Sequence, residues 1–153
     1  MVAAAGQISD LQAIFFGDGP ERGAVLAEIE RRGAETVIFA RGFVSSEEID
    51  AALRRALCML LPSRREGYGL IVIEAATRGT PSIVVAGDDN AATELIEDGV
   101  NGFIADPTPE SIGDAVTRLA AARDRARSLG DAGYDCARRI TWDGVVAKLM
   151  ADG

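Results

Sequence analysis

The chain has 153 residues, and its 24 Asp and Glu against 16 Lys and Arg give a formal net charge of −8. Hydrophobic residues make up 48% and charged residues 26%, which is typical of a globular protein and excludes a disordered chain. The acidic excess disfavours general nucleic-acid binding, and no apolar run approaches the roughly 20 residues of a membrane span.

The chain contains no histidine, which excludes Ser-His and Cys-His catalysis and removes the commonest transition-metal ligand. Its two cysteines, Cys58 and Cys136, are far apart in sequence and form no disulfide framework, which favours a cytoplasmic protein. Cys58 lies in an apolar run, so we expect a buried small hydrophobic side chain there. The first ten residues lack the features of a signal peptide.

The first half of the chain alternates short apolar runs with amphipathic ones. Residues 11–16 predict a buried strand, residues 24–32 a helix ended by Gly33, and residues 36–40 a second strand. Ser45 or Ser46 then caps a helix that we expect to continue through residue 57, and Ser45 with Glu48 forms a capping-box pattern. Residues 58–61 predict a third strand, which ends at Pro62.

The second half continues the alternation with a helix over 69–78, a strand over 82–86, a short helix over 90–97 and a short strand at 103–104. Further helices are expected over 109–122, 124–139 and 142–150. Strands that alternate with helices predict a single α/β domain with a Rossmann-like, mostly parallel sheet and helices on both faces. Ligands of such sheets bind beyond the carboxyl ends of the strands, so the loops that follow the strands are candidate binding segments.

The loop after the third predicted strand has the composition of a phosphate-binding turn. Residues 62–70 read Pro-Ser-Arg-Arg-Glu-Gly-Tyr-Gly-Leu, and a predicted helix follows. The glycines allow a ligand to approach the main chain closely, and the N-terminus of the helix presents unpaired N–H groups to an anion. A plain strand-to-helix turn would produce the same pattern, so this loop by itself leaves both interpretations open.

Glu74 lies in the apolar helix sequence Leu-Ile-Val-Ile-Glu-Ala-Ala, eight positions after Glu66. We expect such a helix to be largely buried, and a buried carboxylate needs a partner. Two alternatives remain open for Glu74: it binds ligand hydroxyls in a cavity whose rim carries Glu66, or it forms a buried structural ion pair with an arginine.

Residues 66–75, Glu-Gly-Tyr-Gly-Leu-Ile-Val-Ile-Glu-Ala, resemble the Glu-x7-Glu motif of the group 1 retaining glycosyltransferases, which have the GT-B fold. Four further segments occur in the order expected for that family: 17–22, 41–44, 79–81 and 98–103. The resemblance extends from about residue 11 to about residue 122. It implies that the chain is the C-terminal, donor-binding domain of such an enzyme, and that an N-terminal acceptor domain lies in the same or another chain.

The resemblance also implies a role for each matching residue. Glu66 would be catalytic and face the transferred sugar, while Glu74 would hold the ribose hydroxyls of the nucleotide. Tyr68, Gly69 and Leu70 would contact the sugar and diphosphate through their backbone, and Phe43 and Val44 would flank the base. Glu94 would face the donor, although it matches the family less closely. The donor would be a nucleoside diphosphate sugar, carrying UDP or GDP.

Metal binding is not expected. The pair Asp88-Asp89 could hold Mg²⁺ beside a diphosphate, but Asp89 is also a suitable N-cap for the helix predicted from residue 90. The family implied by the resemblance needs no metal and no other cofactor. Two other functions remain open: a nucleotide-sugar epimerase with the same fold, and a non-catalytic nucleotide-binding module.

Overall fold

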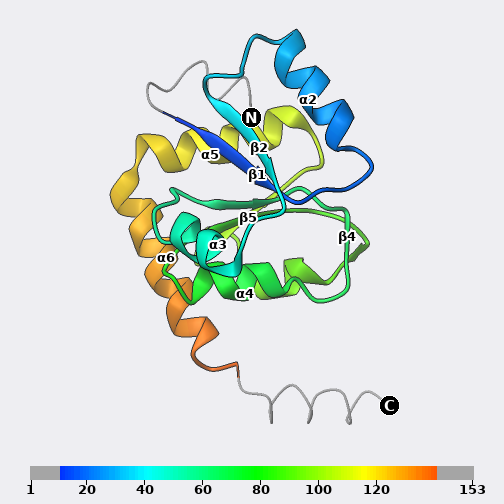
Figure 1. The fold of residues 1–153 in the computed structure, drawn as a ribbon. Helices are drawn as coiled ribbons and strands as arrows, with labels where there is room; N and C mark the ends of the chain where they lie inside the picture. The colour runs from blue at the N-terminus through cyan, green and yellow to red at the C-terminus, as the bar shows by residue number, and fades with distance from the viewer. Residues whose placement is uncertain (1–10, 141–153) are drawn as a thin grey trace.

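The computed structural model describes residues 11–140, and its strands pair in parallel in three small sheets. β1 (Ala13–Phe16) pairs with β2 (Ile38–Gly42), and β5 (Ser82–Val85) lies between β3 (Met59–Leu61) and β7 (Gly102–Ala105). The two-residue strands β4 (Arg65–Glu66) and β6 (Asp89–Asn90) form the third pair. The helices between them are α2 (Arg22–Arg31), α3 (Ser46–Leu53), α4 (Leu70–Ala76), η1 (Ala91–Leu95), α5 (Pro109–Ala121) and α6 (Arg123–Ala137) (Figure 1).

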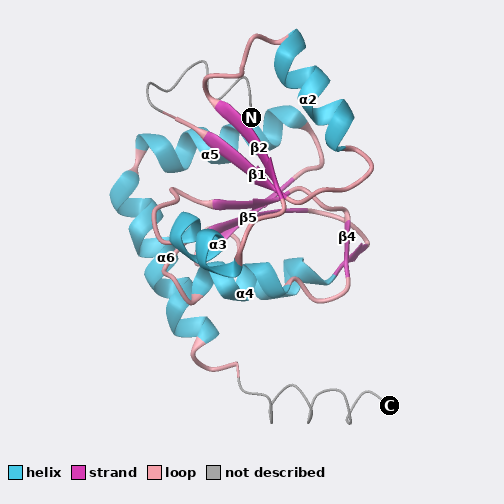
Figure 2. Cartoon of the chain, viewed as in Figure 1, coloured by secondary structure: helices cyan, strands magenta, loops and turns pink. Residues whose placement is uncertain are grey.

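The central strand β5 is buried on both of its faces. Ile83 packs with Phe103, Leu119 and Leu129, whereas its neighbour Val84 packs in a second cluster with residues of α3, α4 and η1. Because successive side chains of a strand point to opposite faces, α5 and α6 contribute to one apolar layer, and α3 and α4 to the other. Figure 2 shows α5 and α4 on opposite sides of this sheet, which confirms the predicted α/β fold.

Local signals place most helix starts correctly. The hydroxyl of Ser45 accepts from the backbone N–H of Glu48 at 3.2 Å, and the Glu48 carboxylate accepts from the N–H of Ser45 at 3.4 Å, which confirms the predicted capping box. This helix nevertheless ends at Leu53 and does not reach residue 57. The Leu53 carbonyl, which residue 57 would need for a helical bond, accepts instead from the Thr80 hydroxyl at 2.7 Å and from the Ala56 N–H.

The strand predicted over 11–16 is present as β1, but the prediction that it is buried is wrong. Ile14, Phe15 and Phe16 are 45%, 36% and 39% exposed. Since these successive side chains alternate between faces, neither face of β1 is fully covered within residues 11–140. Within residues 11–140, β1 pairs with β2 alone, and α2 packs over its first residue, Ala13, together with Ile38.

Other predicted boundaries shift by a few residues, and the helix predicted over 90–97 is a 3-10 helix. Its N-cap is Asn90 and not Asp89, because the Asn90 side chain accepts from the N–H of Ala92 at 3.1 Å. Cys58 is half-buried rather than fully buried and packs against the core, where desolvation raises the pKa of its thiol to about 12. The helix predicted over 142–150 lies outside the described residues.

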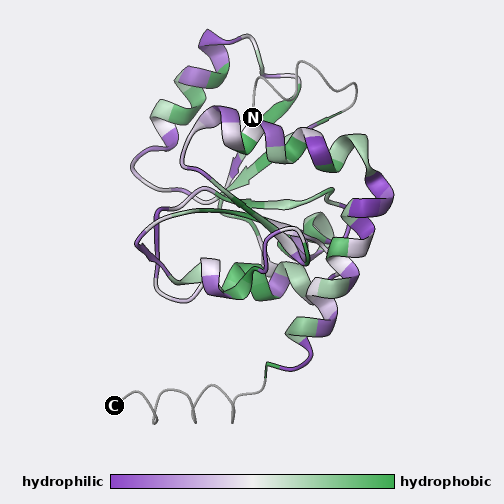
Figure 3. Cartoon of the chain, turned by 180° about the vertical axis from the view of Figure 1, so that it is seen from behind, coloured by the Kyte–Doolittle hydropathy of each residue, from purple (hydrophilic) through white to green (hydrophobic). Residues whose placement is uncertain are grey.

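The strands consist mainly of hydrophobic residues, as the colouring of Figure 3 shows from behind. Hydrophilic and hydrophobic residues alternate along α2, α5 and α6. No helix among residues 11–140 is long and apolar enough to cross a membrane.

Candidate functional site

The loops that follow β3 and β5 meet through their backbones. β4 pairs with β6 in parallel, with Arg65 opposite Asp89 and Glu66 opposite Asn90. A Cβ on Gly87 would stand 2.6 Å from the carbonyl oxygen of Arg64, so this approach requires a glycine. Figure 1 shows β4 at one side of the molecule, where the chain turns into α4.

Asn90 joins the two loops and was not identified as a site residue from the sequence. Its side chain is buried, with 4% of the residue exposed, and its amide donates to the carbonyl oxygens of Ser63 at 2.9 Å and Val85 at 2.7 Å. The same side chain caps η1 through Ala92. Asparagine before a helix is a common cap, so the sequence carried this signal, but we assigned the cap to the preceding residue.

An open groove of about 580 Å³ lies between these loops and η1. Residues that line it include Glu66, Gly67, Gly87, Asn90 and Glu94. The structure thus brings together two predicted site carboxylates, half-buried Glu66 and exposed Glu94, from segments almost 30 residues apart in sequence. Because both lie beyond the carboxyl ends of parallel strands, they occupy the edge at which α/β proteins bind ligands.

Glu74 is exposed, which corrects the expectation that it is buried in α4. Val72 and Ala75 are 3% and 0% exposed and form the core-facing side of α4. Glu74 lies about 200° around the helix from Val72, so its side chain points away from that core. The apolar residues on either side of Glu74 in sequence therefore do not surround it in space.

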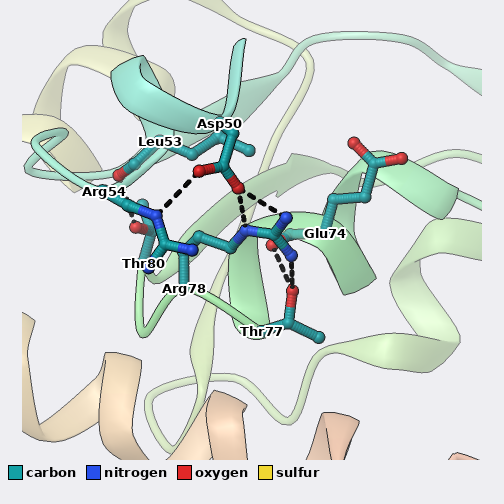
Figure 4. A network of polar contacts seen from close by, with 7 residues as sticks. All are labelled: Asp50, Leu53, Arg54, Glu74, Thr77, Arg78 and Thr80. Carbon is teal, nitrogen blue, oxygen red and sulfur yellow. Dashed lines mark hydrogen bonds and ion pairs between the residues drawn. The ribbon is translucent and has the colours of Figure 1, made fainter. Parts of the chain in front are cut away.

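A buried ion pair between Glu74 and an arginine is also wrong. The carboxylate of Glu74 makes no hydrogen bond or ion pair within residues 11–140, and the nearest arginine in sequence, Arg78, pairs with Asp50 of α3. Figure 4 shows the Glu74 carboxylate pointing away from the Asp50–Arg78 pair. Glu74 is therefore a solvent-exposed acceptor without a partner in the described part of the chain.

The other predicted donor-binding residues lie outside the lining of this groove. Phe43 follows β2 and is 82% exposed, with half-buried Val44 beside it. Tyr68 and Leu70 are 40% and 61% exposed. Gly69 is buried and has a φ of +78°, a backbone conformation that favours glycine.

The described residues offer no obvious metal site, since residues 11–140 hold no cluster of three or more His, Cys, Asp or Glu side chains suited to a cation. Asp89 lies 3.4 Å from Arg65 in an exposed ion pair, and Asp88 is exposed. The expectation that the donor is bound without metal or another cofactor stays a prediction.

The parallel strands, the helices on both faces and the groove at the carboxyl edge define a Rossmann-like α/β protein with a ligand-binding edge. The family model for glycosyl transferases group 1 matches residues 2–135, so the chain belongs to this family. This finding confirms the predicted family.

Individual proteins agree with the family. The chain is 38% identical over 112 residues to alpha-D-kanosaminyltransferase of Streptomyces kanamyceticus, a match that covers 72% of this chain and 28% of that enzyme. Among solved structures, Anabaena Alr3699/HepE in complex with UDP superposes with a TM-score of 0.82 at 21% identity, over 99% of this chain and 44% of that one. The C-terminal domain of the group 1 protein LpcC from Francisella tularensis superposes with a TM-score of 0.80 at 23% identity, over 90% of this chain and 73% of that one.

Proposed function

We propose that this chain is the donor-binding half of a retaining glycosyltransferase that transfers a hexose from a nucleoside diphosphate sugar to an acceptor. One observation carries the proposal: Glu74, the second glutamate of the family motif, presents an exposed carboxylate without a hydrogen bond or ion pair in residues 11–140. A carboxylate kept in this state is available to accept hydrogen bonds from two neighbouring hydroxyl groups, such as those of a ribose.

The roles assigned to the individual residues are those that the family resemblance implies. Glu74 accepts from the ribose hydroxyls, and each hydrogen bond to its charge contributes about 1.5–3 kcal/mol. Glu66 lines the groove and faces the transferred sugar. Glu94 lines the same groove and faces the donor. The backbone around Tyr68, Gly69 and Leu70 lies against sugar and diphosphate, and the loop at Phe43 and Val44 flanks the base. This assignment does not depend on the dipole of α4, which has only seven residues.

The acceptor site and the remainder of the catalytic machinery belong to further polypeptide, in the same or another chain. This part of the proposal is supported by the match to only 28% of the length of the first relative and by the C-terminal position of the LpcC domain in its own protein. The apolar side chains that β1 leaves exposed on both faces also support it. We further propose a cytoplasmic location, which suits the free cysteines Cys58 and Cys136.

The 153-residue chain alone should show no transferase turnover. Positioning two substrates supplies roughly 7–11 kcal/mol of a barrier, and a donor half cannot position the acceptor. Sugar transfer to any acceptor by residues 1–153 would contradict this division of roles.

The proposal is tested by titrating the chain with UDP and with GDP and following the binding of each nucleotide by NMR. We expect a Kd on the order of millimolar for at least one of the two nucleotides, which corresponds to a binding free energy near −4 kcal/mol. Glu74→Gln should weaken that binding at least tenfold while the melting temperature stays the same, because the side chain supports no contact in the described fold. Glu35→Gln, at another exposed glutamate, is the matched control and should bind like the wild type. Equal affinity of wild type and Glu74→Gln would disprove the site.

Two rival functions give different results. A non-catalytic module that binds nucleotides would bind free nucleoside diphosphates but would show no transfer even when the longer protein is assayed. An epimerase of the same fold would convert the nucleotide sugar to its epimer without an acceptor. Product analysis on the longer protein, with and without acceptor, distinguishes these outcomes from transfer with retention at the anomeric carbon.

A further inference from the structure

Glu74 lies in α4, and Arg78 follows four positions later, directly after Thr77, the C-cap of this helix, whose backbone is still in the helical region. A glutamate four residues before an arginine is the favourable order for an ion pair on a helix. The structure shows a different pairing. Arg78 Nε and Nη2 each lie 2.5 Å from Oδ1 of Asp50, which belongs to α3 (Figure 4). Arg78 is thus withdrawn from the one carboxylate that α4 presents to solvent.

Additional contacts hold Arg78 in this position. Its Nη1 donates to the hydroxyl of Thr77, and that hydroxyl donates to the backbone carbonyl of Glu74 at 2.8 Å. The second oxygen of Asp50 accepts from Arg54 Nε at 2.7 Å. The side chains of Asp50 and Arg78 are 31% and 30% exposed, so this pair is better shielded than the other ion pairs in residues 11–140.

Asp50 is an anion at neutral pH. The guanidinium of Arg54, together with that of Arg78, holds the pKa of the Asp50 carboxyl below its usual value. Asp50 therefore competes for Arg78 with a full charge at neutral pH, and Glu74 is left unpaired.

We propose that Asp50 is a positioning residue for the donor site, which holds Arg78 away from Glu74 and so keeps the Glu74 carboxylate free for the hydroxyls of the nucleotide ribose. This inference rests on the proposed function of Glu74. Without Asp50, Arg78 turns to Glu74, and the ribose must displace it. An exposed ion pair such as Glu74–Arg78 forms often enough to raise the Kd of a competing ligand about two- to fivefold.

The test is a double-mutant cycle on the 153-residue chain, with UDP and GDP as probes and with Kd and melting temperature measured for each variant. Asp50→Ala should raise the Kd about two- to fivefold. Adding Arg78→Gln should return the Kd to the wild-type value, because the competing cation is gone, although the melting temperature stays at or below that of the single variant. If Asp50→Ala does not fold, Asp50→Asn replaces it in the same cycle.

Two further variants separate this inference from its alternatives. Asp124→Ala removes an aspartate from another Asp–Arg pair, 3.4 Å from Arg127, and should leave the Kd unchanged. In the Glu74→Gln background, Asp50→Ala should add no further loss, because no carboxylate remains for Arg78 to occupy. A loss that Arg78→Gln fails to restore would show a structural effect of Asp50 and overturn the inference.

The failure of the inference differs from the failure of the proposed function. If Glu74→Gln binds as well as the wild type, the proposed function fails and the inference falls with it. If Glu74→Gln weakens binding but Asp50→Ala does not, Glu74 keeps its role and the positioning role of Asp50 is disproved.

Discussion

Gly69 packs so closely against Ala92 that a Cβ on Gly69 would stand 2.6 Å from the Cβ of Ala92. Gly69 also has a φ of +78°, so both the space and the backbone angle require glycine where the loop enters α4. Gly69→Ala should therefore destabilise the fold by about 2–4 kcal/mol, the combined effect of a strained backbone and an overpacked contact. Gly67→Ala is the matched control, since a Cβ there meets no atom within 4 Å. Urea unfolding of both variants measures the difference, and equal stabilities would contradict the packing.

Asn90→Ala should lower the free energy of unfolding by about 2–4 kcal/mol. The substitution leaves the carbonyls of Ser63 and Val85 and the N–H of Ala92 without their partner in a buried setting. Asp88→Ala, two residues earlier and exposed, should change stability by less than about 0.5 kcal/mol. If thermal melts give the two variants the same stability, Asn90 does not join the loops as the contacts indicate.

Glu66→Gln should separate chemistry from nucleotide binding. Because Glu66 is assigned to the sugar and Glu74 to the ribose, this variant should bind UDP and GDP with nearly the wild-type Kd. In the longer protein the same substitution should lower kcat about 100-fold or more, since it removes a charge that faces the anomeric centre in the transition state. A variant with unchanged kcat and weakened nucleotide binding would reverse the two assignments.

The ion pairs of Asp50 predict the direction in which its pKa responds to mutation. Its folded-state pKa is lowered, chiefly by the hydrogen bond from Arg54, so its stabilising contribution is present above the usual pKa of 3.8 and is lost as the pH falls through the lower, folded value. Arg54→Gln should raise the pKa of Asp50 toward 3.8, and Arg78→Gln should raise it less. Side-chain carboxyl NMR titration measures both shifts, and no rise in either variant would rule out the pairing.

Nucleotide binding by this chain should be insensitive to chelators. The proposed site uses carboxylate and backbone groups, and no cluster of metal-ligating side chains is present in residues 11–140. Addition of EDTA should leave the Kd for UDP and GDP within about twofold, and Mg²⁺ or Mn²⁺ should not restore or enhance binding. A strict requirement for either cation would reassign Asp88 and Asp89 as ligands.

Several features of the protein were determined by the sequence alone, because they depend on residues close together in the chain. The capping box of Ser45 and Glu48 and the end of α2 just before Gly33 arise from contacts over three or four positions, so their patterns could be interpreted directly. The alternation of strands and helices predicted the parallel α/β fold for the same reason. The sequence at residues 66–75, together with the four further segments in the expected order, indicated the family without any structure, since the order of these segments along the chain is itself the signal.

Only the tertiary structure decided which side chains are covered and which partners they choose. Glu74 has apolar neighbours in sequence but faces solvent, because α4 directs Val72 and Ala75 to the core and rotates Glu74 away from it. Arg78 could pair with Glu74 on its own segment, yet the packing of α3 beside it offers Asp50 instead. β1 is as apolar as a buried strand, but within residues 11–140 nothing pairs with its second edge. Burial and pairing depend on elements distant in the chain, so local patterns did not determine them at these three places.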